Sequence, residues 1–95
     1  MEYIICAALW YKTDEVFVHQ PKNIDKGIVF AGRRHHNCFI PLSIAFPQRD
    51  KNSVEQGFLT SKDRFVNRQE AAEIAFAAGQ IKDEANGCLF SEDLY

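Results

Sequence analysis

Residues 67–79 read NRQEAAEIAFAAG, and this stretch decides the fold class of the chain. Asn67 is a favourable N-cap, and Glu70 follows it at the spacing of a capping box. The apolar residues recur at i, i+3, i+4 and i+7 and form one stripe of a helix: Ala71, Ile74, Ala75 and Ala78. Gly79 supplies the left-handed residue that ends a helix. The pattern predicts a helix over about residues 68–78, whose small alanine face lies close against a sheet.

Apolar runs before this helix predict the sheet. Residues 3–11 are nearly all apolar and indicate a buried strand. Residues 16–18 read as a short strand, a candidate hairpin partner of the first, and residues 28–31 as the next strand. Residues 57–60 and 64–66 flank a polar turn, which predicts a small hairpin.

The segment between the strands is harder to interpret. Its apolar residues fit a helical face, but Pro41 forbids a long undisturbed helix, so we expect a short helix near residues 37–46. Residues 47–56 are polar and rich in turn formers, which predicts a mobile loop, and we expect the loop at residues 46–55 to be variable. The expected fold is a single α+β domain over residues 1–95: a small, mostly antiparallel sheet with one main helix. An exposed sheet edge and an apolar C-terminal tail that docks on the body favour a homo-oligomer.

Composition limits the function. A formal net charge of −2 over 95 residues disfavours general binding of DNA or RNA, so any anion site must be local. Three cysteines without a C-x-x-C pair indicate reduced thiols, neither a disulfide framework nor a zinc ribbon, and a cytoplasmic protein. The apolar N-terminus lacks the features of a signal peptide and is too short to span a bilayer, so we expect no membrane partner.

The densest polar cluster follows the strand at residues 28–31 and consists of Arg33, Arg34, His35 and His36. Guanidinium groups match phosphate oxygens in pairs, and histidine adds a donor whose charge a nearby anion favours. The cluster therefore predicts a local anion site. The alternative is structural: the arginines pair with acidic residues, including those of the tail, and one histidine is a core residue whose ring is hydrogen-bonded.

A second cluster lies at the start of the main helix. Arg64 and Arg68 stand beside a helix N-terminus, which attracts anions through its free N–H groups. Phe58 and Trp10 are candidate surfaces on which a base could stack. The alternative is that Asn67 caps the helix, both arginines are solvated, and the aromatic rings belong to the core.

The chain contains no specific enzyme motif. Cys38 lies close to the arginines, but a buried, inert thiol is the commoner state of such a residue. Metal ligation by His35, His36 and Cys38 would need a fourth ligand that no spacing rule selects. We expect no cofactor, no metal and no catalytic residue.

Four blocks of the sequence carry a resemblance to a known family: RHHNCF, QGFLT, RFVNRQEAAEIAFAAGQI and the terminal LFSEDLY. Together they resemble small single-domain proteins of bacteriophage and mobile-element genomes. Phage proteins of this size and style are similar to anti-defence sponges, which sequester the nucleotide signals of bacterial immunity in the Thoeris and CBASS systems. Such sponges are compact homo-oligomers that bind phosphates with arginines and bases with aromatic rings.

The resemblance implies a non-enzymatic binder of a nucleotide signal, with a cyclic ADP-ribose isomer first and a cyclic oligonucleotide next. Two alternatives remain open. One is a phosphodiesterase or glycohydrolase in which His35 or His36 acts as general acid or base with Glu70 or Glu73. The other is an inhibitor that binds a host protein through its tail and sheet edge.

Overall fold

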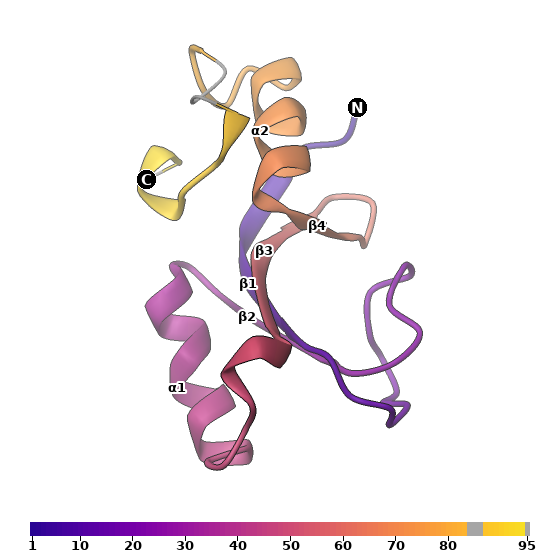
Figure 1. Cartoon of the computed structure of the whole chain (residues 1–95). Coiled ribbons are helices and arrows are strands. Elements are labelled where there is room, and N and C mark those ends of the chain that lie inside the picture. Colours follow the sequence, from indigo (N-terminus) through magenta and orange to yellow (C-terminus); the bar gives the residue numbers. More distant parts are fainter. Residues whose placement is uncertain (84–86, 95) are drawn as a thin grey trace.

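A computed structural model describes residues 1–83 and 87–94 of the chain. In that part the chain forms a four-stranded sheet and two α-helices, which confirms the predicted α+β class (Figure 1). The elements in chain order are β1 (Ile4–Tyr11), β2 (Ile28–Gly32), α1 (His35–Ala45), η1 (Lys51–Ser53), β3 (Val54–Thr60), β4 (Phe65–Asn67), α2 (Arg68–Ala77) and η3 (Ser91–Asp93). None of these helices is both long and apolar enough to cross a bilayer.

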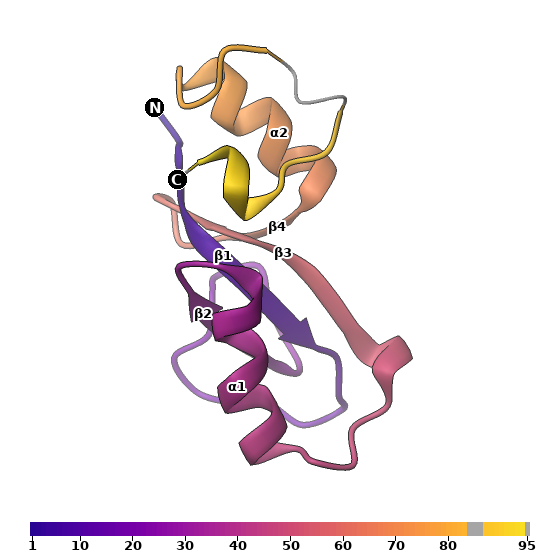
Figure 2. The same ribbon diagram turned by 90° about the vertical axis from the view of Figure 1, so that its left-hand side faces the viewer.

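The sheet has the strand order β2-β1-β3-β4, and each neighbouring pair is antiparallel. Because β1 lies between β2 and β3, these two strands run in the same direction, and α1 forms the crossover between them. Both helices lie on one face of the sheet, and the long connection from β1 to β2 covers the other (Figures 1 and 2).

The main core lies between the helices and the sheet. The inward side chains of β1 and β3 meet buried residues of both helices: Ala7, Leu9, Phe58, Cys38, Leu42, Ala71, Ala72 and Ala75. The alanines have no long side chain to hold α2 away from the sheet, as predicted. The Asn67 side chain accepts a hydrogen bond from the Glu70 N–H at 2.8 Å, and Gly79 has a φ of +75° just after the helix. The capping signals of the sequence therefore place α2 correctly.

The connection from β1 to β2 packs its Ile24 against Phe65 and Ala8 on the other face. Phe65 also covers Gly57, where an added Cβ would lie 2.7 Å from Phe65 Cζ and 2.1 Å from the Val66 carbonyl oxygen. Only glycine therefore fits at position 57.

Two side-chain amides from the same connection cover the edges of the sheet. On β4, the Asn23 Nδ2 donates to the Phe65 carbonyl oxygen at 2.6 Å, and its Oδ1 accepts from the Phe65 N–H at 2.8 Å. On β2, the Gln20 Oε1 accepts from the Val29 N–H at 2.8 Å. The edge expected to promote oligomerisation is therefore partly closed within one chain.

One expectation needs correction. Residues 16–18 do not form a strand: Val16 makes only an isolated bridge to Gly27. The short helix expected near residues 37–46 is present as α1, which begins two residues earlier, at His35, and continues through Pro41. The buried side chains of Cys38 and Leu42, on either side of Pro41, hold both halves of α1 against the sheet and offset the hydrogen bond that proline cannot donate.

Candidate functional site

The first residue of α1, His35, points into the protein. The residue is 9% exposed, and its ring packs edge-on against Phe58 with the ring centroids 5.0 Å apart. Nε2 lies 2.8 Å from the Gly57 carbonyl oxygen, and Nδ1 lies 3.5 Å from Arg68 Nη2. Because a carbonyl oxygen only accepts, Nε2 carries the proton and Nδ1 accepts from Arg68. Burial, and then the nearby Arg68 charge, lower the pKa of His35, so the ring is held neutral.

Arg68, the first residue of α2, connects four parts of the fold. Nη1 donates to the Leu89 carbonyl oxygen at 2.8 Å, and Nη2 donates to Gln56 Oε1 on β3. The Arg68 carbonyl oxygen accepts from the Leu89 N–H at 3.0 Å. The guanidinium carbon lies 4.6 Å from the centroid of the Phe90 ring, a cation–π contact. Arg68 thus fixes the C-terminal tail, α1 and β3 to one another.

Arg34 precedes α1 and also faces the tail. Its Nη1 lies 4.0 Å from Glu92 Oε1, and the Arg34 and Glu92 side chains are 30% and 70% exposed. Figure 2 shows the tail with η3 between α2 and the start of α1. We call Arg34, His35 and Arg68 the arginine cluster. The two structural alternatives considered for this region, an arginine paired with the tail and a histidine in the core, both describe contacts present here.

The structure places the other candidate residues elsewhere. Arg64 binds Glu2 through two hydrogen bonds, Nε to Oε2 at 2.9 Å and Nη2 to Oε1 at 2.8 Å. These bonds, with one from Thr60, lower the pKa of Glu2 to about 2, so Arg64 anchors the N-terminus. Trp10 lies on the opposite face, with its Nε1 3.0 Å from the Lys26 carbonyl oxygen.

Phe58 is completely buried, so stacking of a base on it would require its ring to leave the core. Arg33 and His36 are exposed at the start of α1.

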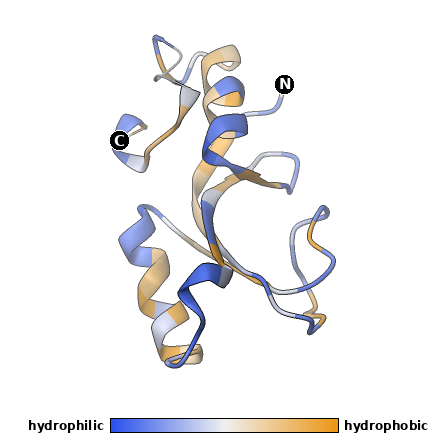
Figure 3. Cartoon of the chain, in the orientation of Figure 1, coloured by the Kyte–Doolittle hydropathy of each residue, from blue (hydrophilic) through white to orange (hydrophobic). Residues whose placement is uncertain are grey.

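A groove beside the arginine cluster carries two further cations. It has a volume of about 260 Å³ and is lined by Phe39, Arg49, Lys51, Val54 and Gln56. We call it the basic groove. Gln56 connects it to the arginine cluster, because the Gln56 Oε1 accepts from Arg68 and the amide N–H groups remain as its donors. Figure 3 shows hydrophilic segments at the first turns of α1 and α2 and over η1, around this region.

The groove could not be recognised from the sequence, because Arg49 and Lys51 fall in a polar segment that predicts a loop. The sequence signal for the groove was the pair of cations two residues apart in QRDKN, residues 48–52. The lining comes together through the register of β3 against β1 and through the position of Phe39 on α1. Neither of these can be read from a local sequence pattern.

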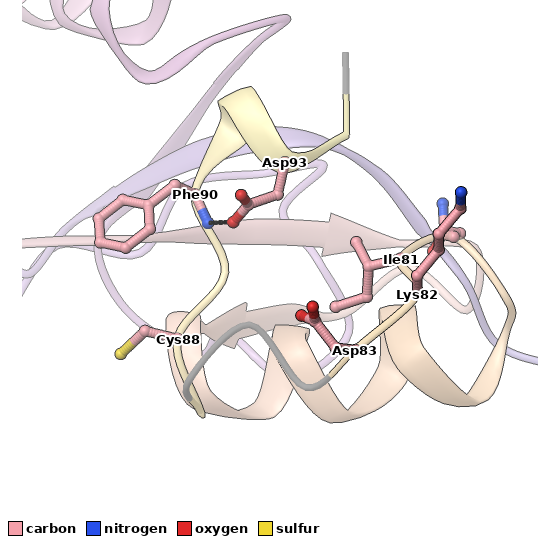
Figure 4. Close-up of a pocket in the computed structure, with 7 residues that line it drawn as sticks. Ile81, Lys82, Asp83, Cys88, Phe90 and Asp93 are labelled. Carbon is pink, nitrogen blue, oxygen red and sulfur yellow. Dashed lines mark hydrogen bonds between the residues drawn. The ribbon is translucent and has the colours of Figure 1, made fainter.

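A second groove, of about 580 Å³, has a different character (Figure 4). Its lining combines one cation with two acidic residues: Gln80, Ile81, Lys82, Asp83, Cys88, Phe90 and Asp93. The acids disfavour an anion there. Among the described residues, no group of three or more His, Cys, Asp or Glu side chains is placed to hold a metal ion. Burial raises the pKa of the Cys38 thiol to about 11, so this thiol is protonated and unreactive at neutral pH.

The fold and these sites define a small α+β protein with a local concentration of cations on an otherwise acidic chain. Residues 3–95 match the model of the phage T4 y16D protein family, and the chain belongs to this family. No curated protein and no solved structure matches the chain. The family assignment confirms the phage part of the resemblance, whereas the anti-defence part stays a prediction.

Proposed function

We propose that this phage protein binds and sequesters a phosphate-containing small molecule of the nucleotide type, in the cytosol of the host cell, without cleaving it. The ligand would lie in the basic groove and extend towards Arg68 and Arg34. From the resemblance to anti-defence sponges, a cyclic ADP-ribose isomer is the first candidate and a cyclic oligonucleotide the second.

The observation that carries the proposal is the lining of the basic groove. Arg49 and Lys51 offer charged donors for phosphate oxygens, and Phe39 offers an aromatic wall. No acid lines the groove among the described residues, although the whole chain is acidic. A binding site for an anion in such a chain has to be local, and here the cations are gathered beside an aromatic ring.

Sequestration fits the groove better than cleavage does. General acid–base catalysis needs a titratable group at hydrogen-bond distance from the reacting atoms. Both ring nitrogens of His35 contact protein atoms, and the Glu70 carboxylate is used in the capping box of α2. Neither lines the basic groove.

The size of the groove bears on the affinity. Two charge-assisted contacts contribute roughly 1.5 to 3 kcal/mol each, and one stacked base contributes roughly 1 to 3 kcal/mol. After the cost of association, this sum corresponds to weak binding by one chain. Tight sequestration would therefore require a second copy of the chain to close the groove.

A thermal-shift screen against cyclic ADP-ribose isomers, cyclic dinucleotides, ADP-ribose and NAD tests the proposal, with chromatography of the recovered ligand. A ligand at 100 times its dissociation constant adds about 2.7 kcal/mol of stability. Arg49→Gln with Lys51→Gln should abolish the shift. Lys22→Gln with Lys26→Gln removes the same charge from the connection on the opposite face and should preserve it.

Recovery of intact ligand supports sequestration, whereas altered ligand would indicate an enzyme. The proposal fails if no nucleotide shifts the melting temperature, or if the two double variants behave alike.

A further inference from the structure

The end of the tail, residues 90–94, is folded on itself. The Phe90 N–H donates to Asp93 Oδ2 at 2.9 Å, the Asp93 N–H to the Phe90 carbonyl oxygen at 2.9 Å, and the Leu94 N–H to the Ser91 carbonyl oxygen at 3.2 Å. All three bonds stay within the segment. By contrast, the preceding Leu89 is completely buried. Its N–H donates to the Arg68 carbonyl oxygen, and its own carbonyl oxygen accepts from Arg68 Nη1. Residues 90–94 thus form a folded unit of their own next to Leu89, and Ser91, which is 2% exposed, must leave its buried position when the unit moves.

Side chains join this unit to the rest of the protein. Phe90 lies under the Arg68 guanidinium, Glu92 faces Arg34, and Leu94 packs against the edge of the core. The Phe90 residue is 50% exposed and the Glu92 side chain 70% exposed, so both contacts are open to solvent competition. Exposed ion pairs of this kind contribute little to stability.

The two contacts resemble those that a nucleotide makes. A flat ring lies over a guanidinium group, and a carboxylate stands beside a second guanidinium group. A base could stack on the face of the Arg68 guanidinium as Phe90 does, and a phosphate could face Arg34 as Glu92 does. The tail therefore presents ligand-like chemistry to the arginine cluster, next to the basic groove.

We propose that residues 90–94 are an intramolecular competitor for the nucleotide site, with Phe90 in place of a base and Glu92 in place of a phosphate. This inference rests on the proposed function, since it concerns the regulation of the same site. Ligand binding displaces the unit from Arg34 and Arg68, and the docked tail protects the cluster from weak anions.

The test uses the full chain, with inorganic pyrophosphate and ADP as probes and isothermal titration as the measurement. Glu92→Gln and Phe90→Ala should each tighten binding, by about 2- to 5-fold, the size of an exposed charge contact. Glu73→Gln makes the same charge change on the exposed side of α2 and is the matched control. In the ¹⁵N-labelled wild type, the amide signals of residues 90–94 should move towards random-coil positions as the probe saturates, while the Leu89 signal should not.

Binding by the tail variants alone, or tighter binding by them than by Glu73→Gln, supports the competitor. Wild-type binding with no difference among the three variants, and with unshifted signals from residues 90–94, would overturn the inference and leave the proposed function standing. Failure of every form, the tail variants included, to bind either probe would overturn the inference, whereas the proposed function is decided separately by the nucleotide screen described above.

Discussion

Removal of the Asn23 side chain tests how the sheet edge is closed. In Asn23→Ala, the Phe65 N–H and carbonyl group of β4 both lose their partner, at present 2.8 and 2.6 Å away. Phe65 is only 4% exposed, so water replaces these bonds incompletely. An unsatisfied buried polar group costs about 1 to 3 kcal/mol. Because the amide site is itself part-buried, we expect the lower half of the summed range for the two groups, a loss of about 2 to 4 kcal/mol.

Urea unfolding followed by the fluorescence of Trp10 measures this loss. Trp10 is the single tryptophan, and its ring centroid lies 5.9 Å from that of Phe65, so the probe reports on the perturbed edge. Asn23→Asp keeps an acceptor for the Phe65 N–H but places a carboxylate against the carbonyl oxygen, so it should recover less than half of the loss.

Asn52→Ala, at an exposed position of η1, is the matched control and should change the unfolding free energy by less than about 0.5 kcal/mol. An open β4 edge is also a template for strand pairing, so Asn23→Ala should self-associate in size-exclusion chromatography. If Asn23→Ala and Asn52→Ala have the same unfolding free energy and the same oligomeric state, the Asn23 amide does not close the β4 edge.

Three further predictions concern the loss of stability in acid, at His35 and at Glu2, and the packing of the β3 glycine. The pKa of His35 is lowered below 6.5, so its contribution to stability is complete above pH 6.5 and is lost as the pH falls towards the folded-state value; urea midpoints across this range should fall less in His35→Gln. The Glu2 pKa of about 2 against 4.5 adds a second loss as the pH falls from 4.5 towards 2, which Arg64→Gln should remove. Gly57→Ala places a Cβ 2.1 Å from the Val66 carbonyl oxygen and should lower the unfolding free energy by about 3 kcal/mol or more in the same assay. The control Ala77→Gly, on the exposed side of α2, should lower it by about 1 kcal/mol. A loss in Gly57→Ala no larger than the loss in this control would contradict the steric argument.

The elements that local chemistry determines were predictable. Asn67, the alanine stripe and Gly79 define α2 within one residue, because each signal acts over a single turn. The start of α1 was not predictable in this way. It depends on His35 reaching the Gly57 carbonyl oxygen, 22 residues away in the chain, and on Cys38 packing in the core. Residues 16–18 have the composition of a strand, but side-chain amides occupy the sheet edges instead.

The candidate site shows the same division. The sequence places the cations of RRHH after β2, but only the folded chain shows that Arg34 faces Glu92 of the tail and that His35 contacts Arg68. Arg68 was singled out for its place at a helix N-terminus, and its partners Leu89 and Phe90 come from the other end of the domain sequence. Arg49 and Lys51 were not predicted as binding residues, because a polar segment has the same composition in a solvent-exposed loop and in the wall of a groove.

The tail and the groove together bear on what kind of ligand could be selected. Arg68 is part-buried, which lowers its pKa, and Leu89, Gln56 and Phe90 compensate for the lost solvent with two hydrogen-bond acceptors and an aromatic ring. A single phosphate offers no ring and would exchange one contact for another at little gain. A ligand with a base and two or more phosphates can replace the Phe90 and Glu92 contacts while it also engages Arg49 and Lys51. The docked tail would therefore raise the threshold for binding and favour large nucleotides over the abundant small anions of the cell.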